Sequence, residues 1–214
     1  MFLFTGDPLE LARVGFVIDY QNFHLTAHHH FLLNLSKQKT LLHPLDLCQI
    51  TLKRRSEFFR NEKSKLSITQ VRVFRGLPSN KQDPKNYARN LSQKSEWTKD
   101  SRVEVEYLEL KYRDKQGLPP QEKGIDVLTA LNFVQMAQSG DFDLVILMSH
   151  DTDLAPALMM ASRVQGVRVE SAGWKGLNKL RVKDKNLFHT FLTHEDFLDS
   201  IDLKDYSTKG NSRI

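Results

Sequence analysis

Short apolar runs alternate with longer segments of mixed polarity along the chain. The clearest run is Leu144–Met148, which lies between Gly140-Asp141 and a polar cluster and indicates a buried parallel strand. Further strands are expected at residues 14–18, 68–74, 103–108, 167–172 and 188–192. Charged residues alternate with apolar ones in the 103–108 run, which favours an edge position for that strand.

Between these runs, the pattern predicts helices at residues 44–60, 84–99, 124–138, 154–164 and 195–201. Pro44 and Pro84 suit the first turn of a helix, and Asp83 suits a cap. The 124–138 segment is apolar nearly all round, so we expect it to be deeply packed. A polar, histidine-rich segment separates the first strand from Pro44. The alternation predicts a three-layer α/β fold, with helices on both faces of a parallel sheet.

The length and composition suit one sizeable domain. The chain has 214 residues, 40% of them hydrophobic, and we expect one domain over residues 1–203 and a flexible, polar tail over residues 204–214. The single cysteine, Cys48, excludes a disulfide framework and a cysteine-based zinc site. No apolar stretch has the length of a transmembrane helix, and the N-terminus lacks the basic region and the length of a signal peptide. We therefore expect a cytoplasmic protein that binds no membrane.

Charge is distributed unevenly along the chain. The net charge is +5, but residues 53–115 alone contain 17 Lys and Arg against 9 Asp and Glu. Acidic residues gather instead at the predicted ends of strands. A basic surface beside an acidic pocket suits a polyanion whose backbone must reach metal ions. A solvated basic helix face would have the same composition, so charge alone favours a nucleic-acid partner without requiring one.

Four aspartates occupy predicted element ends. Asp19 follows the first strand, Asp126 begins the 124–138 helix, and Asp151 and Asp153 follow Leu144–Met148. These carboxylates converge if the first and fourth strands are neighbours, which is the usual switch point of such sheets. Converging carboxylates raise one another's pKa unless a cation shares their charge. One or two Mg²⁺ or Mn²⁺ ions would supply that charge and would suit phosphodiester hydrolysis.

Three strings resemble the motifs of the NYN family of PIN-like nucleases. They are Ile18-Asp19-x-x-Asn22, Lys123-Gly124-Ile125-Asp126-Val127 and Ser149-His150-Asp151-Thr152-Asp153-Leu154-Ala155-Pro156, in the family's order over residues 14–172. The resemblance implies a Rossmann-like, PIN-like fold and a metal-dependent ribonuclease. It also implies that Asp19, Asp126, Asp151 and Asp153 are the catalytic, metal-binding acids, and that Asn22 lies near the metal or the phosphate.

Other residues are candidates for contact with RNA, the expected partner. Lys123 begins the second motif, and His150, within the third, is a candidate proton donor or phosphate contact, or a residue that narrows the turn. A phosphate-tracking surface is expected around the end of the second strand and the helix that follows it, formed by Arg72, Arg75, Lys81, Lys85 and Arg89. A homo-oligomer is also compatible with the sequence.

Two departures from the family pattern leave alternatives open. His150 stands where the family usually has Gly, and Asn132 stands where members often carry another acid. The main hypothesis is a Mg²⁺- or Mn²⁺-dependent endoribonuclease acting on single-stranded RNA. The first alternative is an RNA-binding module with weak or lost catalysis. A lesser alternative is a haloacid-dehalogenase-like phosphatase, which needs Asp-x-Asp after the first strand, where this chain has Asp19-Tyr20-Gln21.

Overall fold

Six parallel strands form the centre of the protein in the computed structural model, which describes residues 11–32, 34–59, 65–112, 120–183 and 185–207. The strand order is β3-β2-β1-β4-β5-β6, and every pairing is parallel. The strands are β1 Ala12–Asp19, β2 Leu66–Leu77, β3 Val103–Glu109, β4 Leu144–Met148, β5 Arg168–Trp174 and β6 His189–Leu192.

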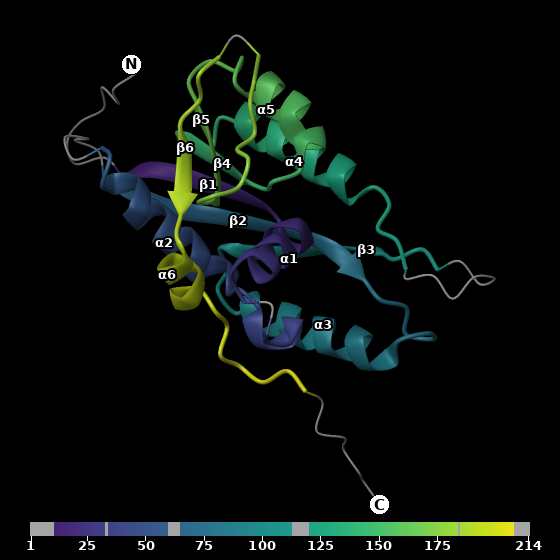
Figure 1. Ribbon diagram of the computed structural model, residues 1–214. Coiled ribbons are helices and arrows are strands. Elements are labelled where there is room, and N and C mark those ends of the chain that lie inside the picture. The colour runs from purple at the N-terminus through teal and green to yellow at the C-terminus, as the bar shows by residue number, and fades with distance from the viewer. Residues whose placement is uncertain (1–10, 33, 60–64, 113–119, 184, 208–214) are drawn as a thin grey trace, which may run out of the picture.

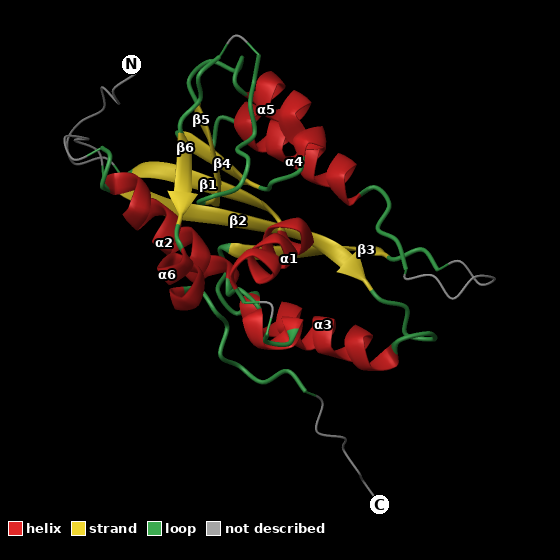
Figure 2. Cartoon of the chain, in the orientation of Figure 1, coloured by secondary structure: helices red, strands yellow, loops and turns green. Residues whose placement is uncertain are grey.

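Helices cover both faces of this sheet, as Figures 1 and 2 show. One face carries α1 Tyr20–Phe31, α2 Pro44–Ser56, α3 Pro84–Trp97 and α6 His194–Asp199, and the other carries α4 Ile125–Gln138 and α5 Ala155–Ala161. Two short 3₁₀ helices are η1 Lys37–Thr40 and η2 Thr152–Leu154. The predicted three-layer, Rossmann-like α/β fold is therefore confirmed.

Two apolar cores lie between the layers. The core beneath α1, α2, α3 and α6 includes Phe23, Leu47 and Trp97, whereas the core beneath α4 and α5 includes Phe133 and Leu158. Every residue of β4 is buried because both faces of this central strand are covered, which explains its uninterrupted apolar run. The edge position predicted for the third strand is confirmed, since β3 pairs with β2 alone.

The direction in which successive strands extend the sheet reverses after β3, so the switch point lies between the neighbouring strands β1 and β4. Strands β1 to β3 extend the sheet one way, and the crossover through α4 returns the chain to pair β4 with β1, with Ile18 opposite Met148. The predicted neighbourhood of the first and fourth strands is thus confirmed. Ligands of open α/β sheets bind at this switch point, outside the carboxyl ends of the strands.

The histidine-rich segment after β1 is a helix, α1, which the sequence pattern did not predict. Its buried face consists of Tyr20, Phe23, His24, Ala27 and His28, which is helical spacing with histidines at two core positions. Both imidazoles lie within hydrogen-bond distance of one hydroxyl, Thr40 Oγ1, at 3.2 and 3.1 Å. These bonds satisfy the polar groups of the two histidines inside the core. The histidines therefore pack at core positions of α1 where sequence patterns usually show apolar residues.

Two other expectations need correction. Helix α4 is not deeply packed all round, because Val127 and Leu131 are 62% and 64% exposed on its outer side. The predicted flexible tail from residue 204 begins too early, because the Tyr206 ring is buried in the core and its hydroxyl donates to Asp202 Oδ2 at 2.7 Å. Residues 208–214 lie outside the described part of the chain. Among the described residues, no helix is both long and apolar enough to cross a membrane.

Candidate metal centre

Three of the predicted aspartates meet at the switch point. Asp19 is the last residue of β1, Asp151 follows β4, and Asp126 lies in the first turn of α4. One carboxylate oxygen from each lies within 4.8 Å of the other two. Asp19 is buried, Asp151 is half-buried and Asp126 is exposed, so the cluster opens to solvent on one side. This geometry is compatible with one shared divalent cation.

The entry into α4 explains why a glycine precedes Asp126. Gly124 has a φ of +86°, a left-handed conformation that residues with a Cβ rarely adopt. The turn at Gly124 lets the chain start α4 so that Asp126 falls in its first turn, where the helix dipole favours a negative charge. The Lys-Gly-x-Asp string therefore has a conformational reason beside its chemical one.

Hydrogen bonds from two polar side chains fix the loop that carries Asp151. Ser149 Oγ donates to Asp19 Oδ2 at 2.9 Å and accepts the backbone N–H of Asp151 at 3.0 Å. Asn22 Oδ1, from the first turn of α1, accepts the backbone N–H of His150 at 2.9 Å. Asn22 thus joins α1 to the third motif, and Ser149 links two of the three carboxylates directly.

The cluster carries more negative charge than its surroundings neutralise. The pKa of Asp19 is raised to about 7, chiefly by burial; the Ser149 hydrogen bond opposes the rise, and the nearby Asp126 and Glu122 carboxylates contribute to it. The pKa of Asp126 is raised by desolvation and by Asp151 and Asp153. Burial also raises the pKa of Glu122, a fourth carboxylate near the centre. A divalent cation would favour the charged form of each group.

Asp153 does not join the three clustered carboxylates. It lies exposed in η2, and its backbone N–H donates to Asp151 Oδ1 at 2.9 Å. Asp151 therefore caps this turn while also facing the centre, whereas Asp153 acts on the centre through its charge. The sequence predicted Asp151 and Asp153 together because both follow β4, but the tight turn of η2 separates their carboxylates.

His150 is held by the protein at both ring nitrogens. Nε2 accepts the backbone N–H of Trp174 at 3.0 Å, Nδ1 lies 3.1 Å from the Asn178 carbonyl oxygen, and the ring stacks on Phe23. The Nδ1–H tautomer satisfies both bonds. Burial lowers the pKa of His150 and keeps the ring neutral. These contacts do not support the predicted role as proton donor or phosphate contact; they give the imidazole a place between β5 and α1.

The predicted basic surface is divided between the two faces of the sheet. Arg72 Nη1 donates to Asn132 Oδ1 on α4 at 2.9 Å, whereas Arg75 Nη1 donates to Gln93 Oε1 on α3 at 2.7 Å. An odd spacing of three along β2 places their side chains on opposite faces. Arg72 therefore does not join the surface that the other arginines form. Arg89 lies on α3 with Arg75 nearby, and the remaining predicted contacts are exposed, namely Lys81, Lys85 and Lys123.

Sequence reasoning missed Ser149 as a positioning residue and Glu122 as a fourth acid. Ser149 stands inside the quoted third string, and its place directly after a buried strand was the available signal. Glu122 immediately precedes Lys123-Gly124, and its Oε1 accepts the backbone N–H of Gly76 at 2.7 Å. Only the sheet topology brings Gly76, at the end of β2, next to the loop before α4.

Comparisons with known proteins give the chain no family. No family model matches it, and no curated protein matches it. The solved structures include a similar chain, a protein of unknown function from Vibrio parahaemolyticus. The two share 15% sequence identity at a TM-score of 0.49, over 92% of this chain and 93% of the other.

Proposed function

We propose that the protein is an endoribonuclease that uses Mg²⁺ or Mn²⁺ to hydrolyse phosphodiester bonds in single-stranded RNA. The observation that carries this proposal is the meeting of Asp19, Asp126 and Asp151 within 4.8 Å at the switch point of the sheet. The motif resemblance and the basic residues around β2 and α3 support the choice of RNA.

The chemistry of the donors fits a hard divalent cation. All three clustered groups are carboxylates, and oxygen ligands are those that Mg²⁺ and Mn²⁺ prefer. Burial and, to a lesser extent, neighbouring carboxylates raise the pKa values of Asp19 and Asp126, and a bound cation would oppose both effects. Asp19, Asp126 and Asp151 would hold the ion, with Asp153 and Glu122 adding negative charge around it.

The bound ion would activate water and neutralise charge on the scissile phosphate. The protein's own contribution is position. Ser149 Oγ fixes Asp19 through Oδ2 and holds the Asp151 backbone, while Asn22 fixes the backbone of His150. These bonds keep β1, β4 and α1 in register at the centre, so the carboxylates need little rearrangement when substrate binds. Exposed Asp126 lies on the open side, where an RNA strand would approach.

An activity assay on single-stranded RNA tests the proposal. Wild-type protein is expected to cut RNA with Mg²⁺ or Mn²⁺ and to stop when EDTA is added. Asp126→Asn should abolish cleavage because one shared ligand loses its charge, whereas Asp141→Asn is the matched control. Asp141 is an exposed aspartate before β4, at the opposite edge of the sheet. Undiminished cleavage by Asp126→Asn from a preparation free of other nucleases would refute the proposal.

A second candidate function is RNA binding without turnover. Asn132 favours it, because its Oδ1 accepts from Arg72 and adds no carboxylate to the centre. This candidate predicts salt-sensitive RNA binding and intact RNA after long incubation with Mn²⁺. Steady turnover that depends on Asp126 would reject it.

A further inference from the structure

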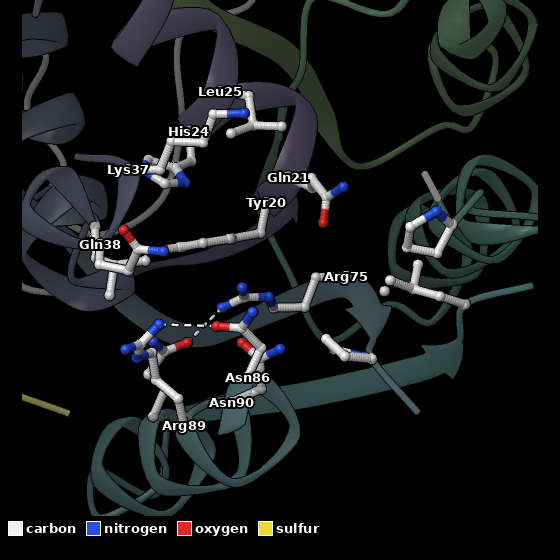
Figure 3. A pocket seen from close by; sticks show the side chains of 16 residues that line it. Tyr20, Gln21, His24, Leu25, Lys37, Gln38, Arg75, Asn86, Arg89 and Asn90 are labelled. Carbon is white, nitrogen blue, oxygen red and sulfur yellow. Dashed lines mark hydrogen bonds between the residues drawn. The ribbon is translucent and has the colours of Figure 1, made fainter. Parts of the chain in front are cut away.

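A cavity of about 370 Å³, lined by both polar and apolar side chains, lies near the acidic centre. Figure 3 shows it between α1, η1, β2 and α3, with Arg75 on one side and Asn86, Arg89 and Asn90 on another. Tyr20, which follows Asp19, and Gly76, whose N–H binds Glu122, both line it. The cavity therefore lies beside residues that flank the acidic centre, and its volume is within the roughly 300–1,000 Å³ of small-molecule sites.

The lining is strongly cationic. Lys37, Arg75 and Arg89 line the cavity, and the described lining residues include no aspartate or glutamate. His24 adds no charge near neutral pH, because burial lowers its pKa to about 3. Three positive charges without a lining carboxylate attract an anion. This wall contrasts with the acidic centre beside it.

Neutral groups, rather than carboxylates, hold the two guanidinium groups. Arg75 binds Gln93 Oε1, and its guanidinium lies 4.8 Å from the centre of the Tyr20 ring and 5.9 Å from that of Trp97. Arg89 Nη1 donates to Asn86 Oδ1 at 2.8 Å. Among the described residues, no carboxylate forms a salt bridge with either arginine. Arg75 lies near enough to Glu122 for its charge to lower the pKa of that carboxyl, but the described residues hold neither arginine in an ion pair. Two guanidinium groups held in this way suit the binding of a phosphate.

The remaining polar lining consists of side-chain amides. They come from three elements and are Gln21, Gln38, Asn86, Asn90 and Gln93. Asn86 and Gln93 already accept hydrogen bonds from the arginines, and Asn86 Nδ2 donates to Asp83 Oδ2 at 2.7 Å. The amides of Gln21, Gln38 and Asn90 carry both donors and acceptors, which is the chemistry that reads the edges of an unpaired base. Apolar side chains complete the walls and suit the faces of a base, namely Leu25, Leu41, Leu110, Pro78 and Pro120. A phosphate alone would need only the cations, so the amides indicate a larger ligand.

We infer that this cavity binds one unpaired nucleotide of the RNA strand, with its phosphate against Arg75 and Arg89 and its base among the amides. The inference rests on the proposed function, and it makes this nucleotide the neighbour of the phosphodiester that lies at the acidic centre. A paired base would present its edges to its partner strand instead. The cavity would therefore select unpaired RNA and set the position of the cut.

Binding measured without cleavage tests the inference. The Asp126→Asn variant in EDTA is titrated with a short, fluorescently labelled single-stranded RNA, and anisotropy gives the affinity. On this background, Arg89→Gln from α3 and Lys37→Gln from η1 remove charge from opposite walls. Arg163→Gln removes the same charge from an exposed site after α5, on the other face of the sheet. Thermal unfolding verifies that each variant is folded.

We expect each cavity variant to weaken RNA binding by about tenfold. The slope of log affinity against log salt concentration should fall by about one, which corresponds to one lost phosphate contact. The Arg163→Gln control should leave both nearly unchanged. Uridine monophosphate should displace the RNA more effectively than inorganic phosphate, and uridine should not displace it. Equal effects of the cavity and control variants, or no displacement by uridine monophosphate, would overturn the inference.

The same design separates this inference from the proposed function. If the cavity variants weaken RNA binding but wild-type protein never cleaves with Mn²⁺, the nucleotide site stands and the nuclease proposal falls. If wild-type protein cleaves and Arg89→Gln cleaves with the same KM and at the same positions, the nuclease stands and the inferred nucleotide site falls.

Discussion

Replacing Asp19 with asparagine should stabilise the metal-free protein, although it removes a proposed metal ligand. Asp19 is 1% exposed, and burial raises its pKa from 3.8 to about 7. The folded state therefore holds the proton more tightly than the unfolded state. As the pH rises from about 4 through 7, the folded protein must ionise a buried carboxyl, and its stability falls. Above pH 7 the whole penalty is present.

The size of the effect follows from the two pKa values. The difference between 3.8 and about 7 corresponds to about 4 kcal/mol of lost stability at pH 8. Asn at this position has nearly the same shape and keeps an oxygen that accepts from Ser149 Oγ, as Asp19 Oδ2 does at 2.9 Å. The Asp19→Asn variant should thus gain up to about 4 kcal/mol at pH 8 and almost nothing at pH 4.

Urea unfolding in EDTA at the two pH values measures this difference, with the exposed Asp141→Asn as control. Saturating Mg²⁺ should then stabilise the wild type, by about 2.7 kcal/mol at a hundred times its dissociation constant, and should leave Asp19→Asn unchanged. A destabilising effect of Asp19→Asn on the metal-free protein at pH 8, or an equal effect at pH 4 and pH 8, would contradict a raised pKa of Asp19.

Three further predictions concern residues outside the acidic cluster. Arg55→Met should lower the free energy of unfolding by about 1.5–3 kcal/mol, because the buried carboxylate of Glu170 loses its 2.8 Å ion pair with Arg55 and keeps the 2.6 Å pair with Arg168; an unchanged midpoint in urea would contradict this. Tyr206→Phe should cost about 1 kcal/mol through its lost hydrogen bond, and a neutral result would place Tyr206 outside the cooperative domain. His150→Ala should cost about 1–3 kcal/mol, since the buried N–H of Trp174 loses its acceptor. Because burial lowers the pKa of His150, its contribution is full above pH 6.5 and declines as the pH falls, and a pH-independent cost would argue against the assigned contacts.

The sequence predicted the sheet because its central strands are buried on both faces. Leu144–Met148 appears with the predicted bounds, since nothing polar interrupts a strand that helices cover on both sides. Helix α1 was missed for the opposite reason. His24 and His28 occupy core positions, and their hydrogen bonds to Thr40 supply the compensation that an apolar pattern cannot reveal.

The candidate centre was predictable only in part. Element ends and strand order suffice to bring Asp19, Asp126 and Asp151 together, because parallel strands share one edge. The separation of Asp153 depends on the turn after Asp151, where a side-chain cap sets the geometry. Glu122 approaches through a loop contact with Gly76, far away in sequence. Long-range loop contacts of this kind leave no periodic signal along the chain.

The cavity beside the centre shows the same limit. Arg75 and Arg89 were predicted as phosphate contacts from charge, but the amides around them come from α1, η1 and α3. Arg72, three residues before Arg75, faces the other side of the sheet and binds Asn132. Strand alternation alone is enough to separate these two arginines, because an odd spacing along a strand reverses the face.

Anomalous diffraction from a crystal soaked in Mn²⁺ would locate the metal ion in the proposed centre. We expect one strong anomalous peak bound by oxygens of Asp19, Asp126 and Asp151, at distances of about 2.1 Å, and its loss in Asp126→Asn. A peak held by other residues, or no peak at this cluster at saturating Mn²⁺, would contradict the proposed metal centre.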